Sequence, residues 1–173
     1  MPQPMINVVA ECYSDILEKR TNTTAINLGG ALPQKGYKVL LIDLDGQANL
    51  TESLGFSAEL PQTIYGAMKG EYDLPIYEHK DGLSVVPSCL DLSAVETELI
   101  NEAGRELILA HLIKGQKEKF DYILIDCPPS LSLLCRATIW PRVSRGWLEM
   151  FPMALTRAAA LRMVKCRPLA MAR

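Results

Sequence analysis

The chain has 173 residues, of which 49% are hydrophobic and 22% charged, with a formal net charge of −2 at pH 7. This length fits one domain with a substantial core, and the composition excludes a disordered or fibrous class. No apolar stretch reaches the roughly 18 residues of a membrane-spanning helix, and residues 1–4 lack the features of a signal peptide. We therefore expect no membrane span and a cytoplasmic protein with reduced cysteines.

The charges are divided unevenly along the chain. Residues 1–135 hold 10 Lys/Arg against 19 Asp/Glu, whereas residues 136–173 hold 8 Lys/Arg and a single acid, Glu149. The second segment therefore carries a charge of +7, and it also contains both tryptophans. A change this abrupt predicts that the last part of the chain differs from the rest in origin or in role.

Apolar runs and breakers predict alternating strands and helices. In chain order we expect a weak strand over 5–10, a helix over 23–35, a strand over 38–43, helices over 50–54 and 62–68, a strand over 83–87, helices over 91–101 and 105–114, and a strand over 120–126. The first helix is expected to be capped near Asn22 or Thr23 and to end near Gly36. Strands that alternate with helices favour an α/β domain with a mostly parallel sheet.

Two of the predicted strands end in acidic residues. Four apolar residues, 39–42, lead into Asp43 and Asp45, and the apolar residues 122–125 lead into Asp126. Open α/β sheets bind ligands at the carboxyl ends of their strands. These carboxylates are therefore the candidate site, although an aspartate at a strand end can also serve only as a turn residue.

Several stretches of the chain resemble a known family. They are residues 23–29, 36–45, 47–51, 86–88, 90–92 and 120–134. Together they are similar to the ParA/MinD-type partition ATPases, close to the Soj branch, which are AAA-type ATPase domains with a deviant P-loop. The resemblance implies a three-layer α/β fold of the P-loop NTPase type, truncated at its C-terminal side. It implies a domain over 1–134, divergent in 1–22, followed by a divergent basic tail over 135–173.

The resemblance also implies roles for individual residues. Asp45 matches the aspartate that positions the water attacking the γ-phosphate of ATP, and Asp126 matches the aspartate that holds Mg²⁺ through water. The other matching positions are expected to lie at the nucleotide: Thr23, Asp43, Gln47, Asn49 and Pro128. The implied partners are nonspecific DNA, a ParB-like protein and, with ATP bound, a second copy of the chain.

The chain departs from the family where the phosphate loop should lie. The family has Lys-Gly-Gly-Val-Gly-Lys-Thr-Thr, and the aligned residues 16–23 contain no glycine. Thr21 replaces the phosphate-binding lysine, Asn22 replaces the magnesium-binding threonine, and Ile16 replaces a lysine that reaches across the dimer. A P-loop needs glycines because its amides must converge on phosphate without Cβ atoms in the way. We therefore predict impaired ATP binding.

Other interpretations remain open from sequence alone. An unusual loop, using Lys19 or Arg20, could still hold nucleotide and give an active partition ATPase. The +7 segment could instead make the chain a nonenzymatic nucleic-acid binder, since basic residues bind phosphates and tryptophans stack on bases. Residues 1–22 and 135–173 could also be unrelated, out-of-frame coding sequence that flanks an intact middle.

Overall fold

The computed structural model describes residues 18–57, 59–80, 82–128 and 160–165. Its sheet has the strand order β2-β3-β1-β4-β5. The strands are β1 (Val39–Asp43), β2 (Tyr77–Lys80), β3 (Leu83–Val86), β4 (Tyr122–Cys127) and β5 (Ala160–Lys165). The helices are α1 (Glu18–Ala31), α2 (Asn49–Ser53), α3 (Ile64–Met68), α4 (Leu92–Glu98) and α5 (Ile108–Lys114). β3, β1 and β4 run parallel, and the flanking strands β2 and β5 pair antiparallel.

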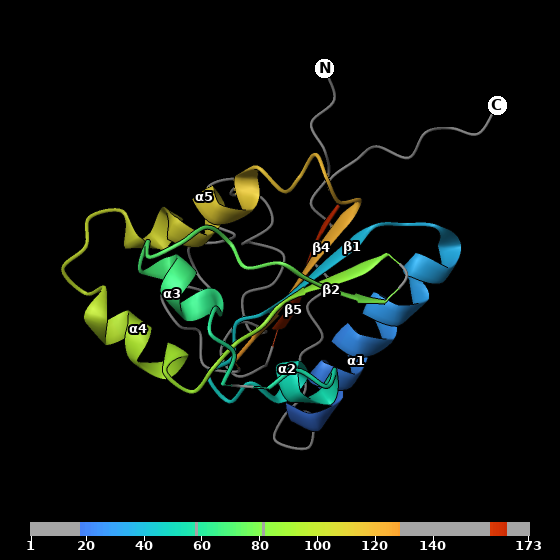
Figure 1. Ribbon diagram of the computed structural model, residues 1–173, viewed down its shortest axis with the longest axis horizontal. Coiled ribbons are helices and arrows are strands. Elements are labelled where there is room, and N and C mark those ends of the chain that lie inside the picture. Colours follow the sequence, from blue (N-terminus) through green and yellow to red (C-terminus); the bar gives the residue numbers. More distant parts are fainter. Residues whose placement is uncertain (1–17, 58, 81, 129–159, 166–173) are drawn as a thin grey trace, which may run out of the picture.

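Helices cover both faces of the sheet, which gives the three layers that the sequence predicts (Figure 1). Alternate residues of β1 point to opposite faces. Val39 and Leu41 join Ala25 of α1 and Leu50 of α2 in one core. The other residues of the strand join a larger core with α3, α4 and α5: Leu40 and Ile42 pack with Leu92, Val95, Leu109 and Ile113. A central strand buried on both faces explains why β1 reads as a continuous apolar run.

Helix α1 differs from its predicted bounds at both ends. It begins at Glu18 rather than at the expected cap near Asn22 or Thr23. No glycine or proline interrupts residues 18–22 and several are good helix formers, so nothing local stops the helix there. It ends at Ala31 because Pro33 cannot continue an α-helix, and a 3-10 turn over Pro33–Lys35 follows. Gly36 ends that turn at φ 83°, as the sequence predicts.

The remaining predicted elements are present with shifted ends. Helix α5 follows a 3-10 turn over Arg105–Leu107, where one continuous helix was predicted. Strand β2 was not predicted, because Tyr77–Lys80 is short and half-buried at the sheet edge. The predicted strand over 5–10 lies outside the described residues.

Strand β5 was also not predicted. It pairs with β4 over six positions, from Tyr122 opposite Lys165 to Cys127 opposite Ala160. The pairing brings residues 160–165 of the expected basic tail into the sheet. Antiparallel pairing satisfies backbone groups on the side of β4 that faces away from β1.

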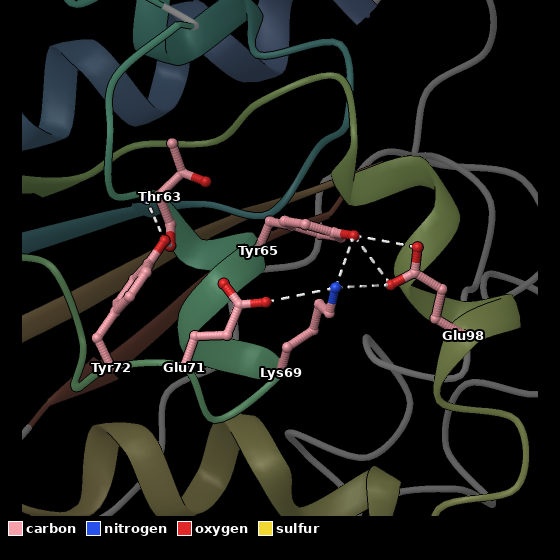
Figure 2. Close-up of polar contacts among 6 residues, drawn as sticks. All are labelled: Thr63, Tyr65, Lys69, Glu71, Tyr72 and Glu98. Carbon is pink, nitrogen blue, oxygen red and sulfur yellow. Dashed lines mark hydrogen bonds and ion pairs between the residues drawn. The ribbon is translucent and has the colours of Figure 1, made fainter.

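A polar cluster joins α3 to α4 on the surface (Figure 2). The Tyr65 hydroxyl lies 2.9 Å and 3.0 Å from the two carboxylate oxygens of Glu98, and Lys69 Nζ lies 3.5 Å from the same carboxylate. Lys69 also approaches Glu71 at 3.4 Å and lies over the Tyr65 ring. The hydrogen bond with Tyr65, and then the nearby carboxylates, raise the pKa of Lys69. The cluster ties together two helices that cover the same face of the sheet.

Among the described residues, none of the helices is both long enough and apolar enough to cross a membrane.

Candidate functional site

Two buried carboxylates lie side by side at the carboxyl edge of the sheet. Asp43 is the last residue of β1, and its Cα partner on β4 is Asp126. They are 0% and 2% exposed. Residues two apart in a strand share a face, so both carboxylates lie on the face that Leu41 and Leu124 present to α1. The structure therefore brings together these two predicted site residues.

The Asp43 carboxylate is held by three hydrogen bonds. Its Oδ2 accepts from the Thr51 amide at 2.9 Å and from the Thr51 hydroxyl at 2.7 Å, and its Oδ1 accepts from the Asp45 amide at 3.1 Å. Burial nevertheless raises the pKa of Asp43 from 3.8 to about 6, because the hydrogen bonds from Thr51 and Asp45 only partly offset the loss of hydration. Asp43 is thus a supporting acid inside the core rather than a group in contact with solvent.

Two further hydrogen bonds close a ring of four residues. Thr51 Oγ1 accepts the Ser88 amide at 2.9 Å, and Ser88 Oγ donates to the Asp45 carbonyl at 2.6 Å. We call the set Asp43, Thr51, Ser88 and Asp45 the polar ring. It joins the ends of β1 and β3 to α2, and so fixes the start of the loop after β1.

The loop after β1 is itself tightly folded. The Gln47 amide donates to Asp45 Oδ1 at 3.0 Å, and the Ala48 amide donates to the Asp45 carbonyl at 3.0 Å. Ala48 has a positive φ of 52°, an uncommon conformation for a residue with a Cβ. Gly46 is buried against Ser93 of α4, where an added Cβ would lie 3.0 Å from the Ser93 nitrogen. Gly46 is therefore packed closely against α4.

The other predicted site residues are more dispersed. Gln47 and Asn49 are exposed, and Asn49 is the first residue of α2. Pro128 is half-buried directly after β4. Thr23 is the sixth residue of α1, so its amide falls where helical amides bond to carbonyls of the same helix. The structure places Asp43, Asp45 and Gln47 in one hydrogen-bonded unit, but Thr23 belongs to a helix rather than to a loop.

A bound nucleotide would contact two parts of the structure at this edge, the carboxylates at the ends of β1 and β4 and the start of α1. The two parts fit it differently. Oxygen ligands suit Mg²⁺, which keeps several of its waters, and the carboxylate of Asp126 has oxygens of this kind. Within the described ranges, however, no group of three His, Cys, Asp or Glu side chains gathers closely enough to hold a metal ion. Residues 20–23 are helical, and an α-helix does not provide the converging amides of a phosphate loop.

Comparison with known proteins identifies the family. A family model described as "AAA domain" matches residues 20–141. The chain belongs to this family. Within it, the similar proteins are of the ParA/MinD type. The sporulation initiation inhibitor protein Soj of Bacillus subtilis is 39% identical over 116 residues, which are 65% of this chain and 46% of Soj.

Solved structures support the same ParA/MinD-type assignment and the P-loop NTPase fold. A Mycobacterium smegmatis cobyrinic acid a,c-diamide synthase, solved with a bound ATP analog and magnesium, has a TM-score of 0.67 at 32% identity, covering 75% of this chain and 52% of that one. A Borrelia burgdorferi plasmid partition protein has a TM-score of 0.58 at 32% identity, covering 68% of this chain and 53% of that one. The chain thus spans about half the length of these proteins.

Thr51 and Ser88 were not predicted as site residues. Both lie in stretches that match the ParA/MinD-type family, but sequence alone gives neither a hydrogen-bonding role. Both are fully buried polar side chains, and such side chains need partners. The sequence offers one signal for each residue. Ser88 is a small hydroxyl residue directly after the predicted strand over 83–87, and Thr51 lies eight residues after Asp43, at the end of the predicted strand over 38–43.

The raised pKa of Asp43 predicts a pH-dependent stability. Between its ordinary pKa of 3.8 and the folded value of about 6, the folded chain binds a proton that the unfolded chain does not. The contribution of Asp43 to the free energy of unfolding therefore falls as pH rises through this interval. The quantity to compare is the free energy of unfolding of the wild-type chain minus that of Asp43→Asn. We expect this difference to be about 2 kcal/mol larger at pH 4 than at pH 7. Urea unfolding of both proteins measures this, and a difference that does not change with pH would contradict it.

Proposed function

We propose that this chain is a ParA/Soj-type partition protein in which ATP binding is impaired. The observation that carries the proposal is the replacement of the phosphate loop by residues 16–23, of which 18–23 belong to helix α1. In P-loop proteins phosphate affinity comes from converging amides and a lysine. Loss of such a cradle weakens binding by several kcal/mol, on the order of a thousandfold or more.

The acidic side of the site supports descent from an ATPase. Asp43 and Asp126 occupy partner positions at the sheet edge, and Asp45 follows in the hydrogen-bonded loop. In the proposed ancestral reaction Asp45 positions the attacking water, and Mg²⁺ supplies charge neutralisation when it is bound. Without the cradle, these carboxylates repel an anionic ligand. An active ATPase with an unusual loop is the second candidate, and the same acidic edge favours it.

Calorimetric titration with Mg²⁺-ATP separates the two candidates. We expect no saturable binding at ATP concentrations up to about 1 mM, the range in which affinities near 4 kcal/mol are still detected. In a second protein, residues 16–23 are replaced by Lys-Gly-Gly-Val-Gly-Lys-Thr-Thr, and we expect binding to appear. Asp126→Ala in each background is the control for the metal side. A micromolar dissociation constant in the unmodified chain, abolished by Asp126→Ala, would establish the active ATPase instead.

The partners of this proposal are nonspecific DNA and a ParB-like protein, in the cytoplasm. An ATP-driven dimer is not expected, because Ile16 stands where the family has its cross-dimer lysine. DNA is supported by the +7 charge of residues 136–173. Basic side chains bind DNA by releasing counterions, so the affinity should fall steeply with salt and show no sequence preference.

Charge neutralisation tests the DNA proposal. Because residues 160–165 pair with β4, deleting the whole tail would disturb the sheet, and substitutions are the better design. We expect Arg142→Gln, Arg145→Gln and Arg157→Gln together to weaken binding and to lower the salt slope by roughly 0.9 for each lost phosphate contact. The control combines Lys114→Gln, Lys117→Gln and Lys119→Gln, which changes the charge equally on exposed residues of the acidic part. Equal loss in both triple variants, measured by fluorescence anisotropy, would place the DNA site elsewhere.

A further inference from the structure

The main chain of Asp45 is held on both sides. Its amide donates to Asp43 Oδ1 at 3.1 Å, and its carbonyl accepts from Ser88 Oγ at 2.6 Å. With both flanking peptide groups fixed, the direction of the Asp45 Cα–Cβ bond is fixed as well. The Gln47 amide then selects the carboxylate orientation by donating to Oδ1 at 3.0 Å. The main chain of this half-buried loop residue is thus held by two buried side chains, Asp43 and Ser88.

Thr51 links Asp43 to Ser88 rigidly because its hydroxyl donates one hydrogen bond and accepts another. The hydroxyl has a single proton, which it donates to Asp43 Oδ2 at 2.7 Å, and its oxygen accepts the Ser88 amide at 2.9 Å. Thr51 and Ser88 are both fully buried, so water cannot replace either partner without a change in packing. Buried networks in which every donor and acceptor is matched hold one geometry, and losing one member disturbs the others.

We propose that Ser88 and Thr51 are positioning residues for Asp45. They do not belong to the reacting groups that the family resemblance implies, and they act through the Asp45 main chain from the end of β3 and from α2. The inference rests on the proposed role of Asp45 as the residue that orients the attacking water. It explains why two fully buried hydroxyl residues lie at a sheet edge that an apolar core could have filled.

The Gln47 amide proton reports the position of the Asp45 carboxylate directly. Because this amide donates to Asp45 Oδ1, the hydrogen bond should slow its exchange with solvent, and hydrogen exchange followed by NMR measures that protection. The readout uses the full chain and needs no nucleotide. Failure of the proposed function in the ATP titration therefore leaves this test unaffected, and the two outcomes are distinguishable.

Four variants complete the design. Ser88→Ala removes the donor to the Asp45 carbonyl, and Thr51→Val removes the hydroxyl that links Asp43 to Ser88. In both we expect the protection of the Gln47 amide against hydrogen exchange to fall by at least about half, because hydrogen bonds weaken steeply with misalignment. Thr51→Ser keeps the hydroxyl and should preserve the protection of the Gln47 amide. Ser53→Ala, at an exposed position of α2, is the matched control and should preserve it too.

The two disruptive variants reach Asp45 by different routes, so either one decides the question if the other does not fold. Amide signals of the central strands, such as those of Leu41 and Leu124, show whether the core remains intact. Unchanged protection of the Gln47 amide in a folded Ser88→Ala or Thr51→Val protein would overturn the proposal. Equal loss in Thr51→Ser would also overturn it, because the effect would then follow the methyl group rather than the hydroxyl.

Discussion

The arrangement of the carboxylates at the sheet edge depends on the two hydrogen bonds made by the Thr51 hydroxyl. This hydroxyl is the only side-chain group of the polar ring that both donates and accepts within the ring, to Asp43 on β1 and from Ser88 after β3. A buried carboxylate with a raised pKa costs stability when it is ionised, and this hydroxyl supplies one of the bonds that offset the cost. Together with the bond that the hydroxyl accepts from the Ser88 amide, this bond links the ends of β1 and β3 and so fixes the start of the loop that carries Asp45.

The central part of the fold follows from short-range sequence patterns. Residues 39–42 and 122–125 are apolar without interruption, which parallel strands covered on both faces require. The acidic residues Asp43, Asp45 and Asp126 follow these strands directly, so their place at the carboxyl edge was predictable. The ring was not, because Ser88 meets Asp45 only through the parallel pairing of β1 with β3. Strand β5 was missed for the same reason, since its partner β4 is far away in sequence.

The two sides of the proposed nucleotide site are built in different ways. The acidic side is part of the core: Asp43 is fully buried, and Gly46 packs closely against Ser93 at the start of α4. α4 is in turn tied to α3 by the Tyr65, Lys69 and Glu98 cluster (Figure 2). The phosphate side would need a glycine loop before α1, and in this chain the helix itself begins at Glu18. The carboxylate of Asp43 is therefore held by hydrogen bonds from Thr51 and Asp45, which lie outside residues 18–23.

If the polar ring holds Asp45 in place, the ring belongs to the cooperative core rather than to a mobile loop. Native-state hydrogen exchange of the ring amides tests it most directly. We expect the Thr51 and Ser88 amides to exchange only through global unfolding, with the same opening free energy as the amides of Leu41 and Leu124. Exchange of Thr51 or Ser88 at least about 100-fold faster than those core amides, a difference of nearly 3 kcal/mol, would contradict this claim.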